Sequence, residues 1–402
     1  MAENKKRHYK LDLNTVIDYV IEKNLFDDRK NLESEEIGDG NINYIYRVKD
    51  RLTNKSVILK QADVLLRSSG RPLSIDRSRI EAEILKYYEN TAGKFTPKIY
   101  DYDEIMCVIA MEDISEYKNM RKELMERKIF PKFAEDIVEF MVKTLLPTTD
   151  LIMDAELKKL EVKKYINPEL CKISEDLVFT EPFIDYKGRN IITEGNLEFV
   201  EEYLYNDFLL HKEVALLKEE FMNNAQALIH GDLHTGSIFI NEKGIKIIDP
   251  EFAFYGPIGY DSGNVIGNLF FDAAYNRFSE GFSEEFENWI LDTAANILEK
   301  FGSELQKELV AENIVDPIRK NDLYLKEYIE SILSYTMGAS GLEILRRTVG
   351  DSKVIELHAL KNGEARIAAE RMLIKIGKEF IKNRSTIRTK ADILKIYKNS
   401  IN

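Results

Sequence analysis

The sequence predicts an α+β protein of two lobes, in which a small β-rich lobe is followed by a larger, mainly helical lobe. The chain has 402 residues, which is long for a single compact domain. Short apolar runs bounded by turn residues dominate up to about residue 113, and apolar residues at helical spacing dominate after it. We therefore expect a smaller N-terminal lobe and a larger C-terminal lobe.

The composition argues against several classes of function. The formal net charge is −13 and the lysines and arginines are dispersed, so nucleic-acid binding is not expected as a main task. Cys107 and Cys171 are the two cysteines and form no CxxC pair, which favours a reducing cytoplasmic location over a disulfide framework or a thiolate metal site. No apolar run approaches the roughly 20 residues that a membrane span needs. The basic start lacks the apolar core of a secretion signal.

In the N-terminal lobe, the apolar spacing predicts a helix over residues 13–23. Residues 36–48 then read as a strand, a tight glycine turn and a returning strand. In that turn, Gly38 and Gly40 let the backbone approach a ligand and direct N–H groups at phosphates. Taken alone, such a hairpin is more often a simple turn.

Residues 56–62 form the next predicted strand, and they include Lys60. A helix is predicted over residues 76–90, where Glu81 shares one stripe with apolar residues at i+3, i+4 and i+7. That stripe is expected to face the lobe interior, so Glu81 is the predicted partner of Lys60 and Glu83 is the alternative.

Two more strands are predicted over residues 97–102 and 105–110, which completes five strands in this lobe. The segment from about residue 115 on reads as mainly helical. The predicted helices cover residues 132–146, 196–219, 283–301, 323–346 and 364–382.

The stretch from residue 227 to 256 carries the groups on which a reaction would depend. It reads ALIHGDLHTGSIFINEKGIKIIDPEFAFYG, which we interpret as a strand, a loop and a β-hairpin that ends on an acidic pair. Asp232 lies in the loop, and Asp249 and Glu251 form the acidic pair. In phosphoryl transfer, one carboxylate engages the attacking hydroxyl and others hold Mg²⁺ against the phosphates. We therefore expect Asp232 to be catalytic and Asp249 and Glu251 to bind Mg²⁺.

The same stretch resembles the catalytic loop of the protein-kinase-like fold, in its small-molecule branch. Where protein kinases have His-Arg-Asp with Asn five positions later, this chain has His-Gly-Asp and Ser237, and Asp249-Pro250-Glu251 replaces Asp-Phe-Gly. HGDLHTGS together with DPEFAFYGPIGYD resembles the S-methyl-5-thioribose kinase family in particular. Aminoglycoside and choline kinases share HGD but normally keep Asn at the position of Ser237.

The resemblance covers about residues 10–385 and implies ATP as phosphate donor. It implies that one set of residues binds this cofactor: Gly38, Asp39, Gly40, Asn41, Asn43, Lys60, Glu81, Glu112, Ile114 and Ser237. Asn43 replaces the third glycine of the kinase loop, and Lys60 matches the lysine of the α- and β-phosphates. Backbone groups near Glu112 and Ile114 match the hinge that binds adenine, which implies an N-terminal lobe over residues 1–113 and a C-terminal lobe over residues 114–402.

The resemblance also implies a sugar site and a support for the catalytic loop. Arg346 and Arg347 match an Arg-Arg pair that contributes to the sugar site of thioribose kinases, together with Asp232. Consecutive helical residues point about 100° apart, so we expect both arginines to reach one ligand only if the helix end frays. Asp261 is expected to support the loop. Arg71 stands where the lid loop of the family carries Trp.

The function implied is transfer of the ATP γ-phosphate to the anomeric 1-hydroxyl of S-methyl-5-thioribose, a step of methionine salvage, by a cytoplasmic homodimer without nucleic-acid or membrane partners. The first alternative is another kinase of the same branch, acting on an aminoglycoside, choline or homoserine. The Arg346-Arg347 pair opposes the strongly acidic cleft that an aminoglycoside requires. A catalytically dead nucleotide-binding scaffold is the second alternative, and the presence of Lys60, Asp232 and Asp249 opposes it.

Overall fold

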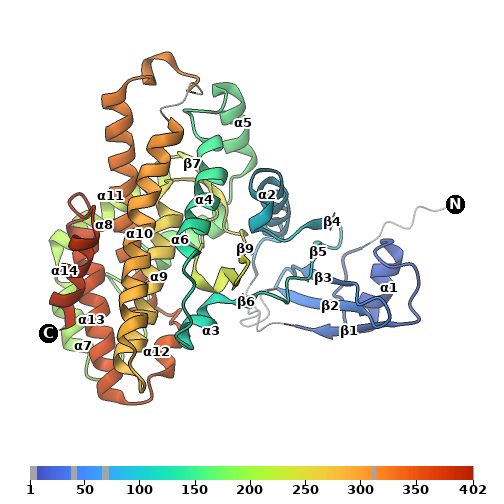
Figure 1. The fold of residues 1–402 in the computed structure, drawn as a ribbon, viewed down its shortest axis with the longest axis horizontal. Helices are drawn as coiled ribbons and strands as arrows, with labels where there is room; N and C mark the ends of the chain where they lie inside the picture. The colour runs from blue at the N-terminus through green and yellow to red at the C-terminus, as the bar shows by residue number, and fades with distance from the viewer. Residues whose placement is uncertain (1–6, 38–42, 66–71, 310–313, 402) are drawn as a thin grey trace. The chain divides into compact units, whose positions relative to one another are not determined.

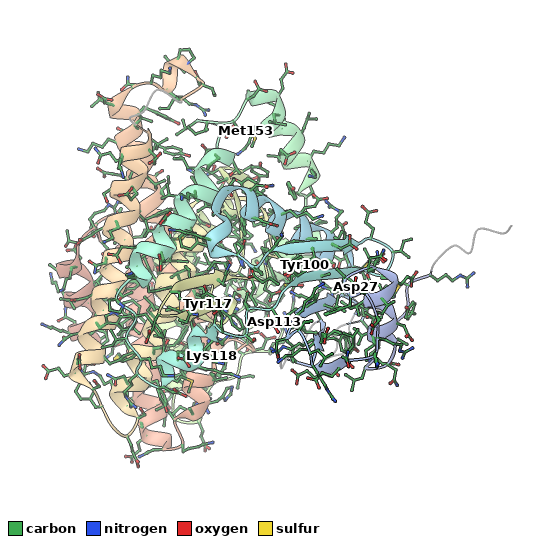
Figure 2. The ribbon with its side chains drawn as sticks, turned by 45° about the vertical axis from the view of Figure 1, so that its right-hand side comes forward. Asp27, Tyr100, Asp113, Tyr117, Lys118 and Met153 are labelled. Atoms are coloured by element: carbon green, nitrogen blue, oxygen red, sulfur yellow. The ribbon has the colours of Figure 1, made fainter. Side chains whose placement is uncertain are left out.

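The computed structural model describes residues 7–37, 43–65, 72–309 and 314–401. The chain forms two compact units, one of residues 1–117 with 246–252 and one of residues 118–245 with 253–402 (Figure 1). Figure 2 labels Tyr117 and Lys118, where the chain first passes from one unit to the other. The sequence-based division followed residue 113, so the compact units differ from it by four residues and by the return of segment 246–252.

The first unit is built on a five-stranded antiparallel sheet in the order β1-β2-β3-β5-β4. Its strands are β1 Leu32–Glu36, β2 Tyr44–Asp50, β3 Ser56–Gln61, β4 Ile99–Asp103 and β5 Val108–Glu112. Its helices are α1 Thr15–Glu22 and α2 Asp76–Ala92, close to the predicted positions. The last strand begins later than predicted because the Asp103 carboxylate accepts hydrogen bonds from the N–H groups of Ile105 and Met106 and holds a turn there.

Successive side chains of β3 point to opposite faces of the sheet, so the strand can contact one helix on each face. Val57 and Leu59 belong to an apolar cluster that includes Val16 and Val20 of α1. Lys60 has the opposite parity and meets Glu81 of α2 instead. The strand is therefore buried on both faces, and its lysine is directed by the pleat rather than by a loop.

The second unit is mainly helical and is organised around α9 Gly259–Phe278. The long helices α10 Glu284–Leu309, α11 Asp322–Val349 and α13 Gly363–Lys382 pack around it (Figure 1). The remaining helices are α3 Met120–Met125, α4 Phe133–Leu145, α5 Ala155–Lys164, α6 Pro168–Leu177, α7 Leu197–Val200, α8 Phe208–Asn223, α12 Ile355–Ala359 and α14 Lys390–Ile401. Among the described residues, no helix is both long and apolar enough to cross a membrane.

Short strands frame the segment that carries the reactive groups. They are β6 Lys118–Asn119, β7 Ala227–Ile229, β8 Ile238–Asn241, β9 Gly244–Ile247 and β10 Phe254–Gly256. β7 pairs with β10, and β6, β8 and β9 form a sheet in that order. The strand, loop and hairpin predicted from residue 227 on are confirmed.

One predicted helix is wrong, and the central helix of the second unit was not among those predicted. The helix expected over residues 196–219 is interrupted by a π-helical turn over Glu201–Tyr205, and Asp207 then caps α8 by accepting a hydrogen bond from the Leu210 N–H. Helix α9 was not predicted, because every residue from Gly259 to Ala274 is buried. Its polar residues do recur at helical spacing, but they are buried inside the unit, so the helix lacks the usual contrast between an apolar inner face and a polar exposed face.

Glycines at four-residue intervals let α9 approach α11 closely. A Cβ atom at Gly263 would lie 2.5 Å from the Ala339 Cβ and 2.6 Å from the Thr336 carbonyl oxygen. A Cβ at Gly259 would lie 2.6 Å from the Ile332 carbonyl oxygen. Because backbone atoms are the obstacle, no rotamer change could make room.

We expect Gly263→Ala to destabilise the fold by about 1–3 kcal/mol, as overpacking does, although alanine favours an unconstrained helix by about 1 kcal/mol. Gly363→Ala is the matched control, because a Cβ there meets nothing within 4 Å. Thermal unfolding of both variants measures the difference. A melting temperature of Gly263→Ala at or above that of the wild type would contradict the packing argument.

Candidate active site

In the first unit, Lys60 is held by two carboxylates. Its Nζ donates to Glu81 Oε1 at 2.7 Å and also contacts Asp249 Oδ1. The predicted pairing of Lys60 with Glu81 is thus confirmed, and Glu83 instead accepts from Arg79. Burial opposes the charge of Lys60, but Asp249 and Glu81 raise its pKa above the ordinary value, so the lysine is charged.

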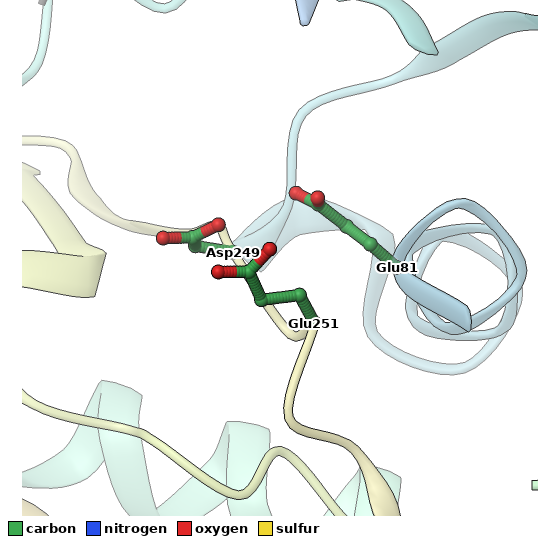
Figure 3. Close-up of side chains that lie close together, drawn as sticks. All are labelled: Glu81, Asp249 and Glu251. Carbon is green, nitrogen blue, oxygen red and sulfur yellow. The ribbon is translucent and has the colours of Figure 1, made fainter. Parts of the chain in front are cut away.

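Glu81, Asp249 and Glu251 gather at one point of this unit. Figure 3 shows their carboxyl groups directed toward one another, and one oxygen of each lies within 4.8 Å of the others. Asp249 has 41% of its side chain exposed, whereas Glu81 has 3% and Glu251 4%. Asp249 has a φ of 71°, in the left-handed region that aspartate tolerates better than most residues. The exposed carboxylate is therefore presented from a turn, beside two buried ones.

Arg77 and Asn43 hold the buried carboxylate of Glu251. Arg77 Nε lies 3.3 Å from Glu251 Oε2, and Asn43 Nδ2 donates to the same oxygen at 3.2 Å. Arg77 Nη2 also donates to Asn43 Oδ1 at 3.0 Å. Sequence reasoning missed Arg77, although it precedes Glu81 by four residues and so shares the inward face of α2.

The charges of this cluster fit a divalent cation. Three carboxylates face two cations, Lys60 and Arg77. Burial raises the pKa of Glu81 and of Glu251, and in both the neighbouring Asp249 adds to the rise. Carboxylate oxygens are the ligands that Mg²⁺ prefers, and an added divalent cation would relieve the excess of negative charge.

In the second unit, Asp261 fixes the loop that carries Asp232. It lies in the first turn of α9, and its oxygens accept hydrogen bonds from the backbone N–H groups of His230 at 2.7 Å and Gly231 at 3.0 Å. Gly231 has a φ of 82°, which glycine adopts without strain. The predicted structural support by Asp261 is confirmed.

Asp232 is bound by both arginines of the predicted pair. Its Oδ1 accepts from Arg346 Nη2 at 2.7 Å and from Arg347 Nη2 at 3.4 Å. Burial opposes ionisation, but His234, Arg346 and Arg347 hold the pKa of Asp232 well below its ordinary value. Burial lowers the pKa of His234, although the neighbouring Asp232 opposes that shift. Ser237 Oγ contacts the backbone oxygen of Asp232 at 3.4 Å, not its carboxylate.

The expectation that the helix must fray at the arginine pair is wrong. Helix α11 continues to Val349, and both side chains still reach one oxygen. Glu343 makes this possible, because its Oε1 accepts from Arg347 Nε at 2.9 Å and its Oε2 from Arg346 Nε. Sequence reasoning missed Glu343, which precedes the pair by three and four residues.

The other predicted cofactor residues are placed as follows. Glu112 ends β5, and its N–H donates to the Lys98 carbonyl at 2.8 Å. The Ile114 carbonyl accepts from the Tyr117 N–H at 2.8 Å. Their role at a nucleotide stays a prediction. Gly38, Asp39, Gly40, Asn41 and Arg71 lie outside the described residues.

Three comparisons with known proteins agree with this arrangement. A family model described as a phosphotransferase enzyme family matches residues 194–295. The chain is 36% identical over 387 residues to a methylthioribose kinase of Geobacillus sp. (strain WCH70), covering 96% of this chain and 94% of that protein. It is 37% identical over 378 residues to a methylthioribose kinase of Geobacillus thermodenitrificans (strain NG80-2), covering 93% and 92%.

A solved structure shows the same fold at low sequence identity. The choline kinase from Cryptosporidium parvum Iowa II aligns with a TM-score of 0.50 and 16% identity, covering 93% of this chain and 98% of that one. The predicted protein-kinase-like fold, with a β-rich N-terminal part and a helical C-terminal part, is confirmed.

We expect Asp261→Asn to loosen the loop that carries Asp232. Two backbone N–H groups each donate to a different oxygen of Asp261, but asparagine has only one acceptor oxygen. One buried donor would then be unsatisfied, which costs about 1–3 kcal/mol of stability. Hydrogen exchange, followed by mass spectrometry of the peptide over residues 227–236, should accelerate by about 10-fold or more. Asp351→Asn, at an exposed position of the same unit, is the control. Unchanged exchange in the Asp261 variant would show that the loop does not depend on this carboxylate.

Proposed function

Because the chain belongs to the methylthioribose kinase family, we propose that it transfers the γ-phosphate of ATP to the 1-hydroxyl of S-methyl-5-thioribose. The observation that carries this proposal is the similarity to methylthioribose kinases over 96% of the chain. The reaction forms a bond between the sugar oxygen and the γ-phosphorus and breaks the bond from that phosphorus to the oxygen bridging to the β-phosphate. ADP and S-methyl-5-thioribose 1-phosphate are the products.

In this proposal Asp232 engages the attacking 1-hydroxyl and receives its proton. The low pKa of Asp232 keeps its carboxylate ionised in the neutral range, so it can accept a hydrogen bond from the hydroxyl, although a carboxylate of low pKa is a weak base. Arg346 and Arg347 would bind sugar hydroxyls, because their Nη groups already converge on Asp232. The acceptor would then lie among one carboxylate and two guanidinium groups.

The first unit would bind ATP and its metal. Lys60, oriented by Glu81, would bind the α- and β-phosphates, and Asp249 and Glu251 would hold Mg²⁺. When bound, the ion would neutralise charge on the phosphates. Residues 38–41, together with Asn43, Ser237 and the backbone near Glu112 and Ile114, are proposed to complete the nucleotide site.

We also propose that the enzyme acts in methionine salvage as a cytoplasmic homodimer without nucleic-acid or membrane partners. The acidic net charge opposes a nucleic-acid partner, the lack of a CxxC pair fits a reducing cytoplasm, and membership of the methylthioribose kinase family supports the salvage role. Light scattering coupled to gel filtration tests the dimer. A mass near 46.6 kDa, that of one chain, would contradict it.

Asp232→Asn should lower kcat by about 100-fold or more, because asparagine cannot accept the proton of the hydroxyl. The affinity for ATP should stay unchanged, since the described contacts of Asp232 are with residues of its own unit. Steady-state kinetics and nucleotide titration measure the two quantities. Asp351→Asn serves as the exposed control, and near-normal kcat in a folded Asp232 variant would remove this residue from the mechanism.

The assignment of the acceptor is tested with a panel of S-methyl-5-thioribose, ribose, choline, homoserine and kanamycin, with the phosphorylated position identified by ³¹P NMR. We expect phosphate on the 1-oxygen of the thioribose and a higher kcat/KM for it than for the others. Removal of divalent cations with EDTA should stop transfer, and added Mg²⁺ should restore it. Equal or better phosphorylation of another acceptor would contradict the assignment while leaving a small-molecule kinase.

A further inference from the structure

Glu343 determines where the two arginines point. It precedes Arg346 by three and Arg347 by four residues on α11, so all three side chains leave the same side of the helix end. Each carboxylate oxygen of Glu343 takes the Nε of one arginine. With the Nε edges occupied, both guanidinium groups direct an Nη2 group at Asp232. Two neighbouring helical side chains are thereby brought to one place.

Glu343 is itself held rigidly. It has no exposed surface, and its Oε1 also accepts from Asn268 Nδ2 of α9 at 2.8 Å. Asn268 in turn accepts from Arg121 Nη2 at 2.8 Å through its Oδ1, which fixes the orientation of its amide. The arginine pair is therefore oriented from the neighbouring helix rather than by its own rotamer preferences.

The charges of this group balance. Asp232 and Glu343 are carboxylates, and Arg346 and Arg347 are cations. Burial alone would raise the pKa of Glu343, but the two arginines outweigh this effect and lower the pKa to about 2. Without Glu343, two buried guanidinium groups would face a single carboxylate. Guanidinium pairs bind phosphate strongly and in defined geometry, so that site would favour an anionic ligand over an uncharged one.

We propose that Glu343 is a positioning and specificity-determining residue, which turns Arg346 and Arg347 toward the acceptor and keeps the site selective for an uncharged sugar over its phosphate ester. This inference rests on the proposed function, in which the arginines contact the sugar. Glu343 itself touches neither reacting atom. Its effect on binding passes through the two arginines.

Two variants distinguish the effect of side-chain length at position 343 from the effect of its charge. Glu343→Gln keeps the shape and one acceptor oxygen but loses the charge, whereas Glu343→Asp keeps the charge but is one methylene shorter. Glu327→Gln, exposed on the same helix, is the matched control. For each protein we would measure kcat, the KM for the acceptor, the KM for ATP, the inhibition constant of the sugar 1-phosphate and the melting temperature.

We expect both Glu343 variants to raise the acceptor KM by about 10-fold or more, the usual effect of losing hydrogen bonds to charged groups. Only Glu343→Gln should bind the sugar phosphate more tightly, by about 5-fold, because it alone leaves an uncompensated guanidinium charge. KM for ATP should stay within about twofold in both variants. A merely structural defect cannot tighten the binding of product.

The proposal is overturned if Glu343→Gln leaves the acceptor KM and the product inhibition as in the wild type. It is also overturned if acceptor, product and ATP all bind more weakly together, which would identify a purely structural residue. Failure of the proposed function is separate, because it would appear in the wild-type protein as preference for another acceptor. The same comparison of variants would then be made with that acceptor and its phosphate.

Discussion

Polar groups buried inside a protein need partners, and in the second unit this constraint acts through helix α9. Although α9 is enclosed by other helices, its Asp261 binds the loop before Asp232 and its Asn268 binds Glu343. Further along, Asn276 accepts from Arg127 Nε at 2.8 Å. The same hydrogen bonds that make burial of the helix tolerable thus fix the loop that carries Asp232 and the arginine pair. Asp272 is an exception: among the described residues neither of its buried carboxylate oxygens has a hydrogen-bond partner, and burial, assisted by Glu356, raises its pKa well above the ordinary value.

The first unit follows the opposite electrostatic pattern. In the second unit two carboxylates meet two arginines, so the described charges cancel. In the first unit three carboxylates meet Lys60 and Arg77, so that ionisation of all three would leave one negative charge in excess, and burial together with the neighbouring Asp249 raises the pKa of Glu81 and of Glu251. A cluster that is short of positive charge is suited to a metal–nucleotide complex, whereas a balanced cluster is suited to an uncharged acceptor. The two halves of the proposed reaction are therefore assigned to sites of different charge.

The parts of the protein that could be predicted are those whose signal is local in sequence. Lys60 and Glu81 were paired correctly because a pleated strand and a helix stripe each leave one inward direction. Helix α9 was missed because its polar residues are buried along with its apolar ones, so the usual contrast between an apolar inner face and a polar exposed face is absent. Arg77 and Glu343 carried a local signal, since each lies three or four residues from a recognised site residue. The hydrogen bond from Asn268 to Glu343 joins positions 75 residues apart, so it could not be predicted from spacing in the sequence.

The low pKa of Asp232 has a consequence for the timing of the proposed reaction. A carboxylate stabilised by two guanidinium groups is a weak base, and it takes little of the proton while the sugar oxygen is still a neutral hydroxyl. Transfer of a phosphoryl group through a loose transition state needs only modest help from the nucleophile. In such a reaction the proton would move late, after the new bond to phosphorus has begun to form and the hydroxyl has become strongly acidic. Asp232 would then serve first to aim a lone pair of the sugar oxygen and only afterwards to collect its proton.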